Sequence, residues 1–145
     1  CHCADEVDAL LTALAEAARA HHDATGQSCG SAFDVPSIVP GGTYYVPGSA
    51  IGQDFAAGDD EAGWPCLGLA APPLIHCRYS YNRGSSPVAS MLGAVSTAGG
   101  PDDFEVAAAG DADGNGLLSA YSIVGKVDSS GQMVLQPMFT HQTSE

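Results

Sequence analysis

The chain has 145 residues, the size of one domain with a buried core. Four Lys and Arg residues stand against 17 Asp and Glu residues, so the formal net charge is −13 with histidine neutral. This charge opposes binding to DNA, RNA or anionic lipid, because their phosphates are repelled wherever salt does not screen them. Only 14% of the residues are charged, and 18 Gly and 9 Pro residues interrupt long elements. These numbers exclude a coiled coil, a helical bundle and a highly charged disordered tail, and they favour an acidic, turn-rich domain with β structure.

The cysteine content suggests where the chain folds. Five cysteines in so short a chain favour an oxidising compartment, and because five is an odd number, one thiol is expected to be free, lipidated or paired between chains. The sequence has no run of about 18 apolar residues, so we expect no membrane span in this chain. It starts at Cys1 without a signal peptide, as a mature or trimmed product would.

The N-terminal segment has the pattern of an amphipathic helix. Residues 4–23 contain neither Gly nor Pro, and apolar residues recur at steps of three and four. Acidic residues crowd the start of the segment and Arg19 and two histidines its end, the order that the helix dipole favours, and Gly26 is the expected stop signal. The stripe expected to pack on a sheet consists of Val7, Leu10, Leu14, Ala17, Ala18 and His21.

The rest of the chain divides into a loop region and a strand region. Repeated Pro and Gly residues predict mostly loop over residues 26–74, with one short strand at 43–46. Trp64 opens a bulky apolar segment that we expect to fold back on the core. In the last half the apolar period changes to two, and turns rich in Asp, Gly and Ser favour consecutive antiparallel hairpins. The predicted strands are 75–81, 104–109, 117–124 and 133–139, and the Gly- and Ser-rich residues 85–100 are expected to form a long surface excursion.

These segments predict an α+β fold, in which an N-terminal amphipathic helix packs on a roughly four-stranded antiparallel sheet. We expect residues 1–145 to form a single domain. Its parts are a helix within 1–25, a loop region at 26–74, a sheet at 75–139 and a tail at 140–145.

Three segments follow the Ala-rich helix in a distinctive order. They read Trp-Pro-Cys-Leu-Gly-Leu at 64–69, Tyr-Ser-Tyr at 79–81, and Phe-Glu-Val-Ala-Ala-Ala-Gly-Asp-Ala-Asp-Gly-Asn-Gly at 104–116. Over residues 4–25 and 64–139, this order resembles the globular domains of type IV pilin-like proteins. The resemblance implies a helix packed on a four-stranded antiparallel sheet in a structural subunit or accessory component of an extracellular pilus-like filament or a secretion pseudopilus. Its partners would be other pilin subunits, at the bacterial surface or in the periplasm.

The chain departs from that family at its start. The Phe-Thr-Leu-Ile-Glu beginning and the about twenty apolar residues through which such proteins assemble are absent, and Cys1, His2 and Cys3 stand in their place. Either the assembly helix has been removed, or the chain is a relative that works without it. Cys1 could also carry a lipid, as in bacterial lipoproteins. An alternative function is therefore a secreted or lipid-anchored calcium- or ligand-binding module on the same fold.

Alternating oxygen-bearing residues form a candidate calcium loop. Asp111, Asp113 and Asn115 are spaced like the first ligands of a calcium loop, with Gly116 at the sixth position. The twelfth position is Ser122 and not the Glu that an EF-hand requires. The same residues are those of a tight hairpin turn, which is the favoured interpretation. If calcium binds, Asp102, Asp103 or Asp128 could complete its coordination; no other cofactor is expected.

The remaining candidate residues are cysteines and histidines. Cys66 and Cys77 lie on either side of the Leu-Gly-Leu segment at 67–69, before the Tyr-Ser-Tyr strand, and are expected to pair. This pair would restrict the unfolded chain and stabilise the fold by about 3 kcal/mol. Cys1, Cys3 and Cys29 are the candidates for a lipid, a free thiol or an intermolecular link. His21 and His22 are expected to be solvated helix-end residues and not metal ligands, because the helix separates them from Cys1 and Cys3.

The sequence carries none of the common catalytic motifs. It lacks a Gly-x-Ser-x-Gly elbow, a His-Glu-x-x-His pair, a phosphate loop and a dinucleotide fingerprint. We therefore expect a structural or interaction protein and no enzyme.

Overall fold

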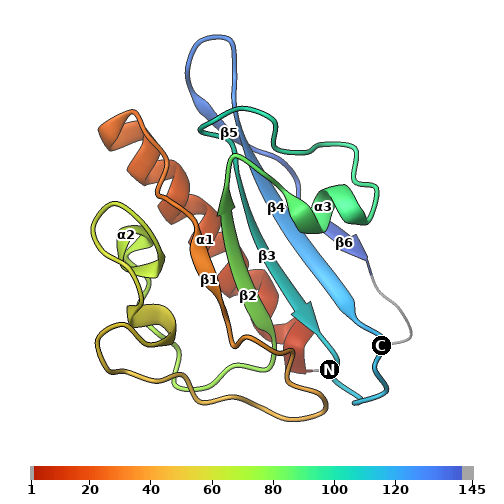
Figure 1. Cartoon of the computed structure of the whole chain (residues 1–145). Helices are drawn as coiled ribbons and strands as arrows, with labels where there is room; N and C mark the ends of the chain where they lie inside the picture. The colour runs from red at the N-terminus through yellow and green to blue at the C-terminus, as the bar shows by residue number, and fades with distance from the viewer. Residues whose placement is uncertain (1, 142–145) are drawn as a thin grey trace.

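One long helix, α1 (His2–Thr25), lies along one face of a six-stranded antiparallel sheet in the computed structural model, which describes residues 2–141 (Figure 1). The strands are β1 (Ala32–Val35), β2 (Arg78–Arg83), β3 (Phe104–Gly110), β4 (Ser119–Val127), β5 (Met133–Leu135) and β6 (Phe139–His141). They lie in chain order from β1 to β5, and β6 also pairs with β4. The predicted α+β class and consecutive antiparallel pairing are therefore confirmed, but the sheet has six strands and not four.

The buried stripe of α1 is rotated slightly from the predicted one. Val7, Leu14 and Ala18 are buried as expected. Leu10, Ala17 and His21 are only partly buried, and the other buried positions are Cys3, Leu11, Ala15 and His22. The helix ends as predicted: Gly26 has φ +79° and its N–H donates to the carbonyl of His22 at 2.7 Å, the left-handed cap that glycine adopts without strain.

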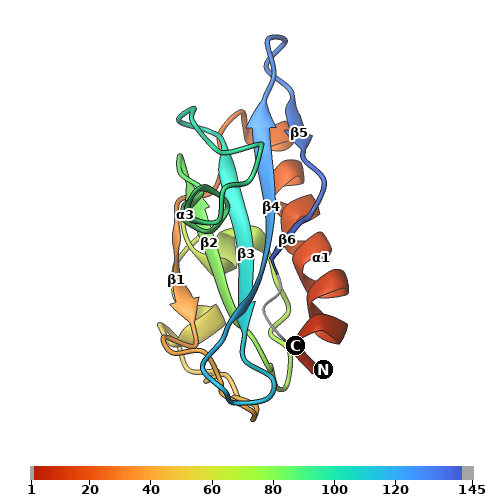
Figure 2. The same ribbon diagram turned by 90° about the vertical axis from the view of Figure 1, so that its right-hand side faces the viewer.

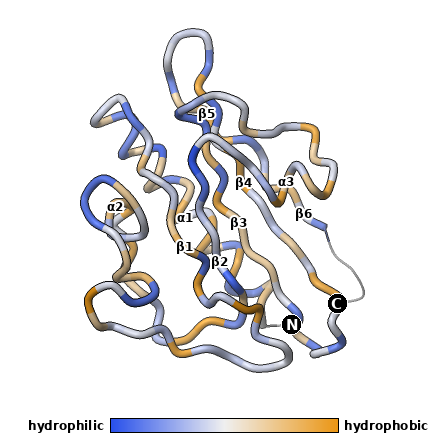
Figure 3. Tube along the Cα trace, in the orientation of Figure 1, coloured by the Kyte–Doolittle hydropathy of each residue, from blue (hydrophilic) through white to orange (hydrophobic). Residues whose placement is uncertain are grey.

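The core lies between α1 and the two central strands. All seven residues of β3 are buried, and β3 has hydrophobic colours where β2 is hydrophilic (Figure 3). The aromatic side chains of Tyr79, Tyr81, Phe104 and Tyr121 belong to this core. The opposite face is covered in part by the short helix α3 (Pro87–Met91), so that α1 and α3 lie on the two sides of the sheet (Figure 2).

The segment that begins at Trp64 folds back on the core as predicted. Trp64 and Leu67 are buried in the short helix α2 (Trp64–Leu67). The indole Nε1 of Trp64 donates to the carbonyl of Phe33 in β1 at 2.9 Å. Its ring also meets Phe55, from the 3₁₀ helix η1 (Asp54–Ala56), edge to face at 5.1 Å between centroids. This tryptophan therefore attaches much of the predicted loop region to the sheet.

Several strand limits differ from the prediction. Residues 43–46 form no strand and contribute a single bridge between Tyr45 and Ile75, whereas β1 was not predicted. The expected strand 133–139 is divided into β5 and β6, because Pro137 has no N–H with which to continue the ladder. Residues 140 and 141 of the expected tail belong to β6, and residues 142–145 lie outside the described part.

Candidate functional site

The cysteine pairing differs from the prediction. The structure contains the disulfides Cys3–Cys77 and Cys29–Cys66, so the predicted Cys66–Cys77 pair is wrong. The first turn of α1 lies beside the start of β2, which brings Cys3 to Cys77, and the chain leaving α1 passes α2, which brings Cys29 to Cys66 (Figure 1). Two such bonds indicate that the chain folds in an oxidising compartment outside the cytosol.

The same two disulfides also test the predictions of a free thiol or an intermolecular link at Cys3 and Cys29. Cys3 and Cys29 are bonded within the chain, so the expected free thiol at Cys29 and intermolecular links through either residue are wrong. Cys1, the candidate for a lipid, lies outside the described residues. Gly110 is needed beside the first disulfide, because a Cβ at this position would collide with Sγ of Cys3.

The candidate calcium loop is a turn held by its own side chains. Asp111 accepts the N–H groups of Asn115 and Gly116 at 3.1 and 2.9 Å. Asp113 accepts the same Asn115 N–H at 3.1 Å. Asp and Asn side chains commonly satisfy the backbone of a tight turn in this way. The predicted residues therefore do come together, in the turn arrangement that the sequence favours.

The acidic residues proposed to complete that site lie elsewhere. Asp102 and Asp103 precede β3 and Asp128 follows β4, whereas the 111–116 turn joins the other ends of these strands. Seven residues of β3 separate the two ends by about 23 Å. These carboxylates therefore cannot reach an ion bound at the turn.

Those three carboxylates serve the opposite end of the sheet. Asp102 binds Arg83 at 2.7 Å and the N–H of Ser28 at 3.1 Å. Burial alone would raise the pKa of Asp103, but N–H donation from Gly99, Val127 and Gly100, together with the charge of Lys126, outweighs burial and lowers its pKa below the usual 3.8. Asp128 accepts the N–H groups and hydroxyl of its own turn, and these hydrogen bonds lower its pKa as well.

A glutamate on α1 holds the start of β2. Oε1 of Glu6 accepts the N–H groups of His76 and Cys77 at 2.8 and 3.1 Å and the hydroxyl of Tyr79 at 2.9 Å. Oε2 lies 3.0 Å from Nδ1 of His76. Burial, the Glu6 charge and this hydrogen bond raise the pKa of the Tyr79 phenol, so the phenol remains a donor. Glu6 and the Cys3–Cys77 disulfide together clamp the first turns of α1 to the sheet.

A second glutamate holds the other face. Glu105 of β3 is fully buried and accepts the N–H groups of Val88 and Ala89 at 3.2 and 2.8 Å and the hydroxyl of Ser122 at 2.7 Å. The first turn of α3 is thus attached to the centre of the sheet. The sequence carries a signal for this role, because Glu105 is the one charged residue within an otherwise apolar strand.

An apolar groove, here called the α1 groove, remains open beside the clamped helix. It encloses about 380 Å³ between α1 and the chain that leads into β2. Its lining is almost entirely apolar and includes Ala9, Leu10, Ala13, Pro72, Leu74 and Ile75. Ala9 and Ala13 are exposed and small, so another helix can approach the backbone of α1 closely here.

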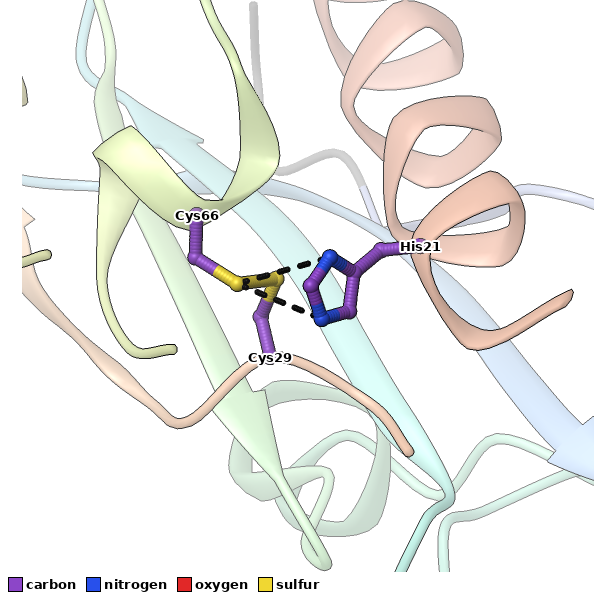
Figure 4. Close-up of side chains that lie close together, drawn as sticks. All are labelled: His21, Cys29 and Cys66. Carbon is purple, nitrogen blue, oxygen red and sulfur yellow. Dashed lines mark hydrogen bonds between the residues drawn. A yellow bond between two sulfur atoms is a disulfide. The ribbon is translucent and has the colours of Figure 1, made fainter. Parts of the chain in front are cut away.

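A histidine and a disulfide meet at the far end of α1. His21, Cys29 and Cys66 are the one group, among the residues that the structure describes, with three closely placed metal-ligating side chains (Figure 4). Both cysteines are oxidised, so in this state neither offers a thiolate. His21 and His22 are not solvated as expected: His21 is partly buried and His22 is 6% exposed.

Comparison of the chain with protein-family models, with curated proteins and with solved structures finds no significant match. Over residues 2–141, no helix has the length and apolar character needed to cross a membrane. The features that bear on function are the order of the sequence segments and the arrangement of α1, the sheet and the α1 groove.

Proposed function

We propose that this chain is the globular part of a type IV pilin-like protein, a non-catalytic structural subunit or accessory component of an extracellular pilus-like filament or secretion pseudopilus. The segment order along the sequence is one support. The other is the architecture, in which one N-terminal helix lies on a sheet whose strands follow in chain order.

The observation that carries the proposal is a helix fixed at both ends with an apolar surface left open. Cys3–Cys77 and Glu6 hold its first turns, and Cys29–Cys66 follows its end. These attachments hold both ends of the helix against the rest of the domain. The α1 groove beside it offers apolar surface for the corresponding helix of a second subunit.

The coding sequence upstream of Cys1 tests this proposal directly. A filament subunit requires a leader that ends in Gly before a Phe-Thr-Leu-Ile-Glu-type apolar helix. A lipobox that ends at Cys1 would contradict assembly through such a helix, and it would support the alternative of a lipid-anchored module.

Calcium binding at residues 111–116 is the second candidate function. The observation that favours it is convergence: one oxygen each of Asp111 and Asp113 lies 3.1 Å from the same backbone nitrogen of Asn115. Both carboxylates therefore place negative charge at this turn, and a divalent cation bound by their oxygens would offset that charge. Calcium is then expected to raise the melting temperature, and Asp113→Asn is expected to abolish the gain. An unchanged melting temperature in calorimetry would exclude this site.

A further inference from the structure

The Cys29–Cys66 disulfide and the His21 ring form a cluster that filament assembly does not use (Figure 4). Sγ of Cys66 lies 3.8 Å from Nδ1 and 3.7 Å from Nε2 of His21. One ligand atom from each of the three side chains lies within 4.8 Å of the others. A ring nitrogen of His21, which can donate a proton, therefore lies within 4.8 Å of Sγ of Cys29, where a thiolate would form if the bond opened by attack at Cys66.

The two disulfides differ in their exposure. Cys3 and Cys77 are 1% and 0% exposed, and Cys29 is 0% exposed, whereas Cys66 is partly exposed. Exchange requires a thiolate to reach a sulfur in line with the S–S bond. Of these four bonded cysteines, Cys66 is the one that is not fully buried, so we expect attack at its sulfur.

We propose that Cys29–Cys66 is a thiol–disulfide exchange site, opened by attack of an external thiolate at Cys66 and assisted by His21, whereas Cys3–Cys77 is a structural bond. The external sulfur bonds to Sγ of Cys66 as the S–S bond breaks, and the electron pair leaves on Sγ of Cys29. Protonated His21 stabilises this thiolate or transfers its proton to it. A second thiolate then attacks the external sulfur and releases Cys66. In total, two external thiols are oxidised to a disulfide, and the protein disulfide is reduced to two thiols.

Opening this bond leaves the surrounding chain attached. Gly30 N–H donates to the carbonyl of Glu61 at 2.9 Å, and Gly63 N–H donates to the carbonyl of Gly30 at 3.0 Å. The Trp64 indole holds β1 from the same segment. The two cysteines therefore stay close after reduction, so the bond can form again.

The surroundings favour a neutral or cationic thiol. A cavity of about 510 Å³ borders His21 and carries the exposed residues Asp60 and Glu61. Arg83 also lines it, but its charge is compensated by Asp102 at 2.7 Å. An anionic thiol would meet net negative charge here and across a chain of charge −13.

The test uses cysteamine, a small cationic thiol, on the folded oxidised protein. After timed exposure, free thiols are blocked with N-ethylmaleimide and the peptides are mapped by mass spectrometry. We expect Cys29–Cys66 to open at least about tenfold faster than Cys3–Cys77 because of their different burial. In the trapped intermediate, cysteamine should sit on Cys66 and maleimide on Cys29. Equal opening rates, or cysteamine on Cys29, would overturn the proposal.

Variants separate proton donation from shielding. His21→Phe keeps a planar ring beside the sulfur without a proton donor, and it is expected to slow opening about tenfold. Gln27→Ala alters the same cavity without touching the sulfur and should leave the rate unchanged. An unchanged rate in His21→Phe would remove His21 from the mechanism.

The choice of thiol tests the role of charge. The rate of each thiol with the protein is divided by its rate with a small disulfide. At low salt, this ratio should be higher for cysteamine than for the anionic 3-mercaptopropionate, and high salt should bring the two ratios together. A faster reaction of the anionic thiol would contradict the assigned thiol class.

Discussion

Replacing Glu6 by Ala is expected to lower the free energy of unfolding by about 3 kcal/mol. The Glu6 carboxylate accepts two N–H groups and the Tyr79 hydroxyl through one oxygen and faces His76 with the other. Each donor that loses its acceptor lowers the free energy of unfolding by about 1 kcal/mol or more. Tyr79 is fully buried, so water cannot replace the carboxylate as the acceptor of its hydroxyl. At roughly 4 °C per kcal/mol for a domain of this size, the melting temperature should fall by about 12 °C.

Urea unfolding measured by the fluorescence of the single, buried Trp64 provides the assay. Asp8→Ala removes an exposed carboxylate from the same helix and is the matched control, expected within about 0.5 kcal/mol of the unmodified protein. Glu6→Gln keeps one acceptor oxygen, so its free energy of unfolding should lie between those of Glu6→Ala and Asp8→Ala. If Glu6→Ala unfolded at the same urea concentration as Asp8→Ala, the clamp would not stabilise the fold.

Three further changes test other parts of the structure. Because folding lowers the pKa of Asp103, its carboxylate contributes fully to stability above the usual pKa of 3.8, and this contribution is lost as pH falls through the folded pKa. Asp103→Asn should therefore destabilise the protein at neutral pH and make its stability fall less steeply in acid. An equal dependence of stability on pH in the two proteins would contradict this. Replacing Cys29 and Cys66 by Ala removes a disulfide between residues 37 positions apart and should lower the free energy of unfolding by about 3.8 kcal/mol. An unchanged urea midpoint would show that this disulfide does not stabilise the fold. Glu105→Ala removes the acceptor of Ala89 N–H, whose hydrogen exchange should accelerate towards that of an exposed amide, whereas unchanged protection would show that α3 is held otherwise.

Elements specified by local pattern could be predicted from the sequence. The helix was expected at residues 4–23 and extends over His2–Thr25, because Ala and Leu favour it and Gly26 ends it. The strand expected at 104–109 is β3, Phe104–Gly110. The turn after it also follows from its Asp, Asn and Gly residues. Each of these features depends on neighbours within a few residues.

Features that depend on distant contacts could not be predicted. The disulfide pairs are set by how α1 lies on the sheet, with sequence separations of 74 and 37, and no spacing rule contains that information. The clamp by Glu6 joins residues about 70 positions apart. β1 is a short edge strand that depends on β2 for pairing. His21 fits the apolar stripe by period, yet its ring meets Cys66, because α2 covers that end of the helix.

Surface filaments from cells that produce this protein provide the most direct test of the proposed function. Filaments sheared from the surface should contain this chain by mass spectrometry and bind antibodies against it under the electron microscope. Ala13→Glu places a charge in the α1 groove and should abolish the filaments, whereas Ser129→Glu, in the exposed turn before β5, should leave them intact. Filaments that lack the chain, or that persist unchanged with Ala13→Glu, would contradict assembly through α1.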